Sequence, residues 1–361
     1  MDSRLLFLPF NWLHRPNICF SYVTLCPVLY FVQITHYDIM FHLFSYKSYL
    51  GTSNHTFVGQ FVLLGLTDDP AIQLYLFVLF MLMYTLTMVG NIGIIMLFVI
   101  TPSLHNPMYF FLSHLSFTDL CYSSVITPKL MDILIIGNKA ISYSGCMIQL
   151  VVFSIFGSLE CLILAVMACD RCAAVCKPLF YHLIMTDAVC RRLIAGCYTS
   201  AISCSLLNAS YALQLNFCST KNIHHFYCDY PPLLKLACSD TSGNQIVLLA
   251  SVSCVSGLSV LTILLSYGYI VYTVLRIKST DGRSKVFYTC SSHLTVVSVF
   301  YGTILFMYLR PGAKYFSDQD KVAAVFYTVV IPILNPIIYS LRSRELQSAF
   351  HKFLGGINLT F

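Results

Sequence analysis

The chain has 361 residues, of which 57% are hydrophobic and only 10% are charged. A soluble domain carries about 25% charged residues, so this composition and the mean hydropathy of +0.75 exclude a soluble protein and indicate one that crosses a membrane several times. The net charge of +6 is explained by basic residues in the short loops between apolar segments, and nothing in it suggests a nucleic-acid partner.

The first 50 residues contain an apolar run from Asn17 to Ile34 that is interrupted by Pro27. The run is long enough for an uncleaved signal or an eighth membrane crossing, and a start codon assigned too far upstream is the alternative that we favour slightly. Residues 51–71 are expected to form an extracellular N-terminus. Asn54 begins an Asn-His-Thr sequon for N-glycosylation, which is useful only on the lumenal side of a membrane.

Seven apolar stretches are long enough to cross a hydrocarbon core about 30 Å thick as helices. They lie near residues 72–100, 107–130, 144–169, 192–213, 244–275, 286–309 and 319–341. Helices are expected because an open sheet would leave backbone groups unpaired in lipid. The sequence therefore predicts an all-α membrane protein in which residues 72–341 form a seven-transmembrane helix bundle. Residues 342–361 are expected to form a short cytoplasmic tail with an amphipathic helix.

The basic residues favour an N-terminus outside the cell. Eleven Lys and Arg residues fall in the loops after the third and fifth segments and in the tail, against seven on the opposite side. Four cysteines belong to the opposite, oxidising side: Cys146 at the start of the third segment, and Cys218, Cys228 and Cys238 in one loop. Four such cysteines suit two disulfides. We favour Cys146 with Cys228 and Cys218 with Cys238, although spacing alone allows three connectivities.

Several polar side chains lie within the apolar segments. Asn91, Asp119 and Asn335 would each cost several kcal/mol if left unpaired in lipid, so they should face one another in the interior of the bundle. Glu160 adds a second carboxyl. Pro332 and Pro336 interrupt the backbone hydrogen bonds of the seventh segment, which makes that helix a natural hinge.

Six motifs occur in order between residues 54 and 343. They are Gly90-Asn91, LHNPMYFFLSHLSFTDL (104–120), MACDRCAAVCKPLFY (167–181), Ser266-Tyr267, SKVFYTCSSHL (284–294) and PILNPIIYSLRS (332–343). Through these motifs the chain resembles the rhodopsin-like (class A) G protein-coupled receptors and, within them, the olfactory (odorant) receptors. The sequence departs from the family's usual pattern in two places: Cys172 stands where Tyr usually follows the motif's Arg, and Ser343 stands where the motif usually ends in Asn.

The resemblance implies an odorant receptor of the plasma membrane rather than an enzyme. Such a receptor binds a small, mostly apolar volatile molecule and activates a stimulatory, olfactory-type G protein, which raises cyclic AMP. Its partners are therefore the odorant, the G protein and membrane lipid. The residues that the resemblance assigns to the switch and to G protein coupling are Asp170, Arg171, Tyr267, His293, Asn335, Pro336 and Tyr339.

The ligand is expected in the outer half of the bundle, under the cysteine-rich loop. Counting helical turns inward from Cys146 and along the fifth and sixth segments gives the candidate lining, which is Phe153, Ser154, Gly157, Ser158, Ser251, Val255, Tyr301, Ile304 and Tyr308. This apolar and aromatic lining with a few hydroxyls suits a small volatile molecule. An amine receptor would need a carboxylate near Phe153, and a retinal protein would need a lysine in the middle of the seventh segment. The sequence has no carboxylate there and no lysine from Val322 to Leu341, so both classes recede.

The resemblance also implies that Asp119 and Glu160 hold a sodium ion. The alternative is a neutral, protonated carboxyl that is hydrogen-bonded to Asn335 or Ser340, since burial raises the pKa of a carboxyl group. Two other classes of protein are the alternatives to a receptor. A transporter or channel would be expected to show internal repeats, which the motifs do not, and would carry ion currents without a G protein. A binding-only protein would take up ligand but never produce cyclic AMP.

Overall fold

The computed structural model describes residues 59–217, 221–277, 280–308 and 318–357 of the chain. The N-terminal extension (1–50), the sequon at Asn54 and the loop cysteine Cys218 lie outside the described residues.

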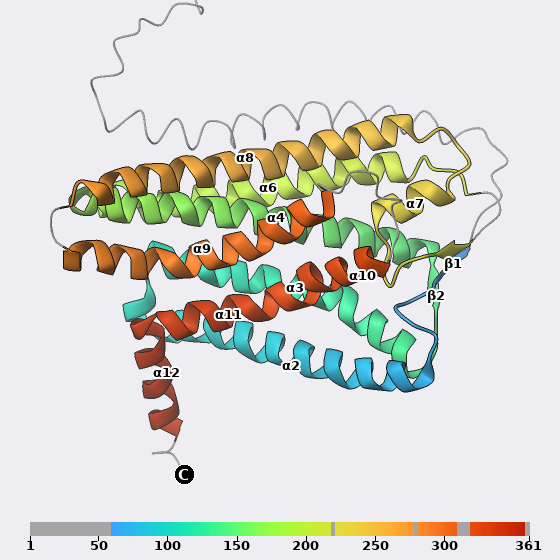
Figure 1. Cartoon of the computed structure of the whole chain (residues 1–361), viewed down its shortest axis with the longest axis horizontal. Coiled ribbons are helices and arrows are strands. Elements are labelled where there is room, and N and C mark those ends of the chain that lie inside the picture. Colours follow the sequence, from blue (N-terminus) through green and yellow to red (C-terminus); the bar gives the residue numbers. More distant parts are fainter. Residues whose placement is uncertain (1–58, 218–220, 278–279, 309–317, 358–361) are drawn as a thin grey trace, which may run out of the picture.

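Seven long helical segments run side by side in the described part of the chain (Figure 1). They are α2 (Pro70–Ile100), α3 (Pro107–Ile135), α4 (Tyr143–Cys176), α6 (Asp187–Ala212), α8 (Ser242–Leu275), α9 (Thr280–Tyr308) and a composite segment made of α10 (Asp318–Val325), the π-helical turn η4 (Phe326–Val330) and α11 (Ile331–Arg342). Shorter helices connect or follow them: η2 (Pro102–Leu104), η3 (Pro178–Phe180), α5 (Tyr181–Ile184), α7 (Tyr230–Leu236) and α12 (Arg344–Ile357). The seven-helix bundle predicted from the sequence is confirmed.

The helices begin where the sequence supplies a side-chain oxygen for the first backbone N–H groups. The carboxylate of Asp69 accepts a hydrogen bond from the backbone N–H of Ala71 at 2.9 Å, just ahead of α2. Asn106, Ser142 and Thr186 cap α3, α4 and α6 in the same way. Such caps satisfy backbone donors that have no partner within the helix.

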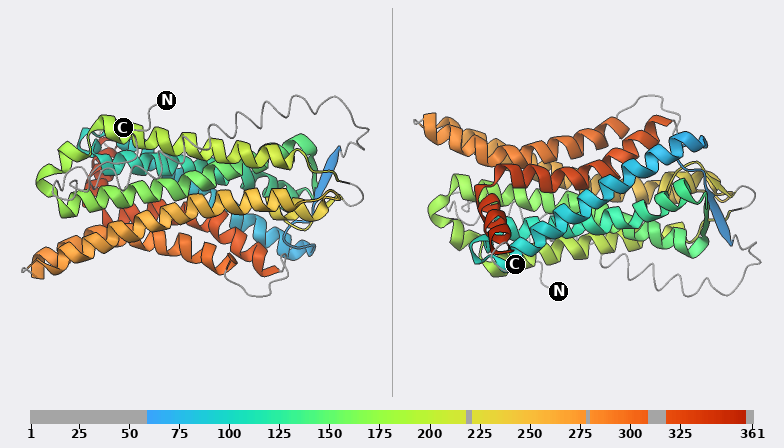
Figure 2. Two further views of the ribbon diagram at one scale, coloured as in Figure 1. Left: turned by 90° about the horizontal axis from the view of Figure 1, so that it is seen from above. Right: turned by 90° about the horizontal axis from the view of Figure 1, so that it is seen from below.

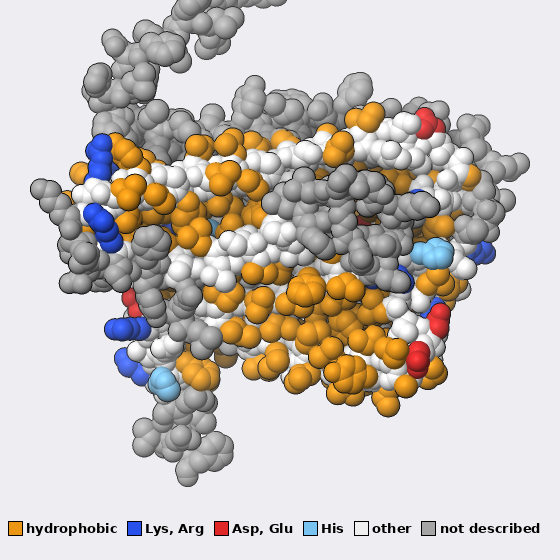
Figure 3. Space-filling model, viewed as in Figure 1, with side chains coloured by type: hydrophobic (Ala, Val, Ile, Leu, Met, Phe, Trp, Pro, Cys, Tyr) orange, Lys and Arg blue, Asp and Glu red, His pale blue; other side chains and the backbone are white. Residues whose placement is uncertain are grey.

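The outer surface is that of a membrane-spanning bundle. Among the residues that the structure describes, five helical segments are long and apolar enough to cross a membrane: Pro70–Ile100, Tyr143–Cys176, Asp187–Ala212, Ser242–Leu275 and Lys321–Ser340. The remaining two, α3 and α9, have 29 residues each and run alongside them. On the face shown in Figure 3, hydrophobic side chains cover the long sides of the molecule and charged side chains gather at its two ends.

The two ends of the bundle differ. At one end, which we call the sheet end, strand β1 (Gln60–Leu63) pairs antiparallel with β2 (Ala140–Ser142) and parallel with β3 (Asn222–Ile223), in the order β2-β1-β3 (Figures 1 and 2). At the other end, which we call the tail end, α12 packs against η2 and α2. Each of the seven segments runs from one end to the other.

Helix α4 lies at the centre, in contact with α3, α6, α8 and α9. All ten residues from 159 to 168, just past the midpoint of α4, are buried. The eight residues of the preceding stretch, 151–158, are all only partly buried. A helix surrounded by four neighbours keeps exposed surface around its circumference only where the interior is open. The interior is therefore more open around residues 151–158 than around residues 159–168.

Several helices continue beyond the ranges expected from hydropathy. The third segment was expected to end near residue 169, whereas α4 continues to Cys176. The sixth was expected to begin near residue 286, whereas α9 begins at Thr280. Charged residues end an apolar stretch, but they do not interrupt backbone hydrogen bonds. Asp170 and Arg171 consequently lie within α4, more than one turn before its end.

Candidate functional site

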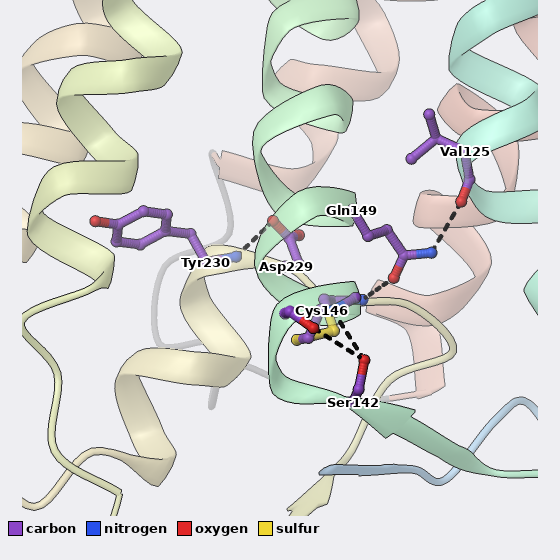
Figure 4. Close-up of a disulfide and its surroundings, with 9 residues drawn as sticks. Val125, Ser142, Cys146, Gln149, Asp229 and Tyr230 are labelled. Carbon is purple, nitrogen blue, oxygen red and sulfur yellow. Dashed lines mark hydrogen bonds between the residues drawn. A yellow bond between two sulfur atoms is a disulfide. The ribbon is translucent and has the colours of Figure 1, made fainter. Parts of the chain in front are cut away.

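A disulfide joins the loop between α6 and α8 to the first turn of α4. Cys146 and Cys228 are bonded, with their Cα atoms 5.4 Å apart, and this is the first of the two pairings expected from the sequence. Gln149, one turn further along α4, strengthens the attachment: its side chain donates to the carbonyl of Val125 in α3 and accepts from the backbone N–H of Cys228, each at 2.9 Å (Figure 4). Of the second expected pair, Cys218 lies outside the described residues.

The disulfide places an aromatic cluster in the sheet-end half of the bundle. Tyr227, the residue before Cys228, is fully buried, with its ring centroid 5.0 Å from that of Phe153 in α4. Phe153 also stacks on Tyr122 of α3 at 5.1 Å. The hydroxyl of Tyr227 lies 2.5 Å from that of Tyr327 in η4 and donates to Asp229 at 3.2 Å. The loop, α3, α4 and η4 thus meet around one set of rings.

Asp229 is held at both carboxylate oxygens. One oxygen accepts the backbone N–H of Tyr230 at 2.8 Å and so caps α7 (Figure 4). The other accepts the Tyr227 hydroxyl. The pKa of Asp229 is raised above its ordinary value, because the effect of burial outweighs that of the two hydrogen bonds, which lower it. A carboxyl group therefore lies close to the aromatic cluster, although none is near Phe153 in the sequence.

Two of the expected lining residues on α4 lie in this cluster. Phe153 stacks on Tyr122, and Gly157 lies against the same ring, because a Cβ atom added to Gly157 would be 3.5 Å from Tyr122 Cε2. Ser158 is partly buried on the same open stretch of α4.

Two expected hydroxyls instead join helices to one another. Ser154 accepts a hydrogen bond from Ser205 of α6 at 3.1 Å. Ser251 of α8 exchanges hydrogen bonds with the side chain of Asn208 in α6, the shorter being 2.9 Å. Small hydroxyl and amide side chains commonly hold membrane helices together in this way. These two serines were expected in the ligand lining, and in the structure they form hydrogen bonds with side chains of α6.

The candidates on α8 and α9 lie deeper. Val255 and Tyr301 are buried in the main core, and the hydroxyl of Tyr301 has no hydrogen-bond partner within the described structure. The side chains of Ile304 and Tyr308 lie outside the described residues.

Three of the polar residues expected in the interior do face one another there. Asn335 of α11 donates from its amide nitrogen to both carboxylate oxygens of Asp119 in α3, at 2.9 and 3.2 Å. Glu160 of α4 is fully buried and close enough to interact electrostatically with Asp119. Ser340, the other partner considered for a protonated carboxyl, donates to Ile337 of its own helix.

Oxygen atoms around this cluster lack protein partners in the described structure. They are the two carboxylate oxygens of Glu160 and the amide oxygen of Asn335. Buried oxygens without partners are costly, and two neighbouring carboxylates repel each other when both are ionised. An all-oxygen set of this kind fits a hard cation such as sodium, whereas the described residues form no group of three or more His, Cys, Asp or Glu suited to a metal ion.

Asn91 connects this region to the proline hinge. Pro336 has no backbone N–H, so the carbonyl of Pro332, four residues earlier, loses its partner within the helix. The side chain of Asn91 donates to that carbonyl at 3.0 Å. Gly90 allows α2 to lie close to α11. A Cβ atom at this position would be only 3.0 Å from the Pro336 ring, which is too close for carbon atoms.

At the tail end, Arg171 is paired with its neighbour. Its guanidinium donates to Asp170 from both Nε, at 3.0 Å, and Nη2. The hydroxyl of Tyr181, in the following loop helix α5, donates to the other oxygen of Asp170 at 2.6 Å. The Asp170 carboxylate is buried and accepts hydrogen bonds from both of these side chains. Its charge-assisted bonds to the guanidinium hold Arg171 against α4.

His293 of α9 connects three helices near the same end. Its Nε2 lies 3.0 Å from the carbonyl of Leu164 in α4, and its Nδ1 lies 2.8 Å from the hydroxyl of Tyr267 in α8. A carbonyl can only accept, so Nε2 carries the proton; in the neutral ring Nδ1 then accepts from Tyr267. Tyr339, also expected in the switch, is buried with a hydroxyl that has no partner in the described structure.

Sequence reasoning did not select Tyr122, Tyr227, Tyr327 or Asp229 as ligand-site residues. Tyr122 lies three residues after Asp119 on the same helix, and this spacing indicates a shared buried face. Tyr227 is adjacent to a disulfide cysteine that must reach α4. No sequence pattern indicated that the loop would bring Tyr227 to η4.

Comparisons with known proteins agree with this arrangement. The family model of olfactory receptors matches residues 80–356. The chain is 50% identical to olfactory receptor 5B21 of Mus musculus over 301 residues, covering 83% of this chain and 94% of that protein. It is 49% identical to olfactory receptor 5B21 of Homo sapiens over 305 residues, covering 83% and 97%. Among solved structures, squid rhodopsin has a similar fold, with a TM-score of 0.64 at 16% identity, covering 81% of this chain and 87% of that one.

Proposed function

This chain belongs to the olfactory receptor family, and we propose that it binds small volatile odorants in the sheet-end half of its bundle and activates a stimulatory G protein, which raises cyclic AMP. The observation that carries the ligand location is the contrast within α4, where residues 151–158 retain exposed surface and residues 159–168 are buried. Aromatic rings with a few polar groups border the open stretch. Such a lining suits a small apolar ligand that forms one or two hydrogen bonds.

We further propose that the protein lies in the plasma membrane with its sheet end outside the cell. Two features support this orientation. The sheet end carries the Cys146–Cys228 disulfide, and disulfides persist in oxidising compartments. The tail end carries Arg171, Arg191 and Arg276, in keeping with the excess of basic residues on the cytoplasmic side of membrane proteins.

The tail end is the proposed G protein contact. Arg171 is held by Asp170, and Tyr267 is engaged with His293, so neither is oriented toward an inserted partner. Ligand binding would shift the population toward a state in which these contacts are exchanged and a groove opens between the helices. A helix of the G protein α subunit would occupy that groove.

The test is cyclic AMP in cells that carry the full chain at their surface, challenged with a broad set of volatile compounds. We expect a response that Arg171→Ala abolishes at equal surface labelling. Lys139→Ala is the control, because Lys139 pairs with the exposed Asp68 at the sheet end, away from the proposed G protein contact, and its loss should leave the response largely intact. Ligand binding that persists without cyclic AMP would show a different G protein or a binding-only protein. Ion currents without any G protein would instead indicate a channel.

We also propose that Asp119, Glu160 and Asn335 hold a sodium ion in the resting receptor. The unpartnered oxygens of Glu160 and Asn335 support this proposal, because a cation would satisfy them and reduce the repulsion between the two carboxylates. An ion that binds this state stabilises it by mass action.

Thermal unfolding of the purified chain distinguishes sodium from a protonated carboxyl. Sodium chloride should raise the melting temperature relative to choline chloride, and Glu160→Gln should remove that difference. Glu345→Gln, at the start of α12, is the control and should retain it. Equal melting temperatures in both salts for the unaltered chain would favour the protonated carboxyl.

A further inference from the structure

Two cysteine side chains lie against each other in the last turn of α4. The sulfur atoms of Cys172 and Cys176 are 3.9 Å apart, which brings them into van der Waals contact. Cys172 is fully buried, whereas Cys176 is partly exposed. The family pattern usually has Tyr where this chain has Cys172, so the pair results from this chain's own departure from that pattern.

Cys176 also joins α4 to α8. Its sulfur lies 3.3 Å from the hydroxyl oxygen of Thr273 and 3.8 Å from the carbonyl oxygen of Tyr269, both in α8. The Thr273 hydroxyl can donate to the sulfur when it is negatively charged. Redox-sensing cysteines are accessible, are active as thiolates and have a second thiol close by. Cys176 combines this exposure with a neighbouring thiol.

The position at the end of the helix allows the two sulfur atoms to bond. Residues four apart in a helix have Cβ atoms about 5–6 Å apart, whereas a disulfide requires about 3.5–4.5 Å, so the backbone must shift. Cys176 is the last residue of α4, and only the bond from Lys177 to Ala173 follows it. A shift there loses one or two terminal hydrogen bonds, each worth about 1 kcal/mol, and leaves the rest of the helix intact.

We propose that Cys172 and Cys176 form a reversible disulfide when hydrogen peroxide rises in the cell, and that this oxidation weakens coupling to the G protein. The proposed orientation places the tail end in the cytoplasm, where disulfides are transient and act in redox sensing. A strained disulfide is also readily reduced, so the modification reverses. The disulfide itself goes beyond the proposed function, and only its effect on signalling rests on that function.

The reaction has two steps. The Cys176 thiolate attacks one oxygen of hydrogen peroxide: an S–O bond forms, the O–O bond breaks, and the other oxygen leaves as hydroxide and takes up a proton. The Cys172 sulfur then attacks the resulting sulfenic acid: the S–S bond forms, the S–O bond breaks, and the oxygen leaves as water. Two thiols thus lose two electrons and two protons, and peroxide becomes two water molecules. Two glutathione thiols reverse the change by exchange and become glutathione disulfide.

The disulfide would alter the proposed G protein contact through two neighbouring bonds. The Cys176 sulfur would leave Thr273 of α8, because it must move toward its partner. The shifted last turn would also displace η3 and α5, which follow it directly. The hydroxyl of Tyr181 in α5 lies 2.6 Å from Asp170, the residue that holds Arg171. Oxidation would therefore distort the surface that a helix of the G protein must meet.

The disulfide can be measured by mass in the full chain. Cells that carry the Cys190→Ser receptor are exposed to peroxide, free thiols are blocked with N-ethylmaleimide, and the purified receptor is digested with trypsin. Trypsin does not cleave before proline, so residues 172–191 form one peptide, in which Cys172 and Cys176 are the only cysteines of that variant. We expect two maleimides on this peptide before peroxide, none after it, and two again when dithiothreitol precedes the blocking step.

The second readout is cyclic AMP evoked by an odorant, divided by that evoked by forskolin, which activates the cyclase directly. In the unaltered chain this ratio should fall in proportion to the fraction of disulfide, and dithiothreitol should restore it. Cys172→Ser should keep its response in peroxide, as should Cys172→Tyr, which restores the family's usual residue. Cys190→Ser is the matched control: it removes another buried cysteine, in α6, and should remain as sensitive as the unaltered chain.

Two outcomes overturn the inference. One is a peptide that contains no disulfide at a peroxide dose that oxidises the peroxiredoxin of the same cells. The other is an equal fall of the response in Cys172→Ser, which would place the sensitive thiol elsewhere. A surface-labelled receptor that is silent to every volatile compound overturns the proposed odorant-binding function instead, and the mass of the peptide still decides whether the disulfide forms.

Discussion

Single residues determine how closely α2 and α11 approach. Pro336 frees a carbonyl in α11, Asn91 satisfies that carbonyl, and Gly90 leaves the space in which Asn91 can reach it. The three residues are useful only together, because a longer separation between the helices would leave the Pro332 carbonyl unpaired in an apolar interior.

Gly90→Ala should therefore destabilise the receptor. The added methyl group would lie 3.0 and 3.1 Å from two atoms of the Pro336 ring, which is closer than carbon atoms normally pack, and the ring cannot rotate away. Overpacking of this kind costs about 1–3 kcal/mol. We expect a lower melting temperature for the purified chain and weaker surface labelling.

Gly93→Ala is the control on the same helix, because nothing lies within 4 Å of a Cβ atom added there. Alanine is the better helix former, so this substitution should be neutral or slightly stabilising. Equal destabilisation by both substitutions would mean that glycine acts through the flexibility of α2 and not through its contact with Pro336.

At the scale of elements, the three-stranded sheet holds the segment before α2 against the loop that carries Tyr227. Phe61 of β1 is fully buried, and its ring meets that of Phe217 edge to face at 5.1 Å. The same cluster contains Cys146 and Cys228. The strand is therefore part of the support for the disulfide and for the aromatic cluster next to it.

Phe61→Ala should weaken that support without affecting the tail end. Replacing a buried phenylalanine by alanine costs about 3–5 kcal/mol, and here the resulting cavity would lie under the loop. We expect odorant potency to fall while basal cyclic AMP per surface receptor stays the same. Gln60→Ala, at an exposed position of the same strand, should change neither quantity. Loss of basal signalling with Phe61→Ala would indicate a fault that extends through the whole bundle.

The sequence predicted the helices far better than it predicted the sheet. A stretch of about 20 apolar residues is a local signal, so the seven segments were recognised. Their ends differed where α3, α4, α6 and α9 continue past charged residues. Strands β1, β2 and β3 have four, three and two residues, and they pair across segments far apart in the chain. Such short strands carry no periodic pattern of their own.

The same distinction applies to the candidate site. Phe153 and Gly157 lie in the aromatic cluster, on the face of α4 that helical spacing indicates. Ser154 and Ser251 instead form hydrogen bonds to α6. Spacing predicts which residues share a face of a helix, but it does not predict which helix packs against that face. The contact between Tyr227 and Tyr327 depends on how one disulfide folds a loop into the bundle. No local pattern encodes that geometry.

At the scale of the whole molecule, α4 keeps exposed surface over residues 151–158, in its sheet-end half, and is buried over residues 159–168, nearer the tail end. Signalling from the ligand site to the G protein requires the tail-end half around this buried stretch to rearrange. Packed helices change between discrete arrangements, so contacts that join several helices in that half determine the balance between resting and active states. His293 makes such a contact, because it joins α9 to α4 and to α8.

His293→Phe should raise basal cyclic AMP per surface receptor. Phenylalanine fills a similar volume but removes the hydrogen bonds to Leu164 and Tyr267, and each is worth about 1 kcal/mol. If both exist only in the resting arrangement, the ratio of resting to active receptor should fall by about fivefold to thirtyfold. Tyr267→Phe removes one of the two bonds and should have a smaller effect in the same direction. His114→Phe is the control, since His114 contacts Tyr198 between α3 and α6 and lies outside this junction. Basal signalling that stays the same or falls in His293→Phe would mean that the junction is kept, or is needed, in the active state.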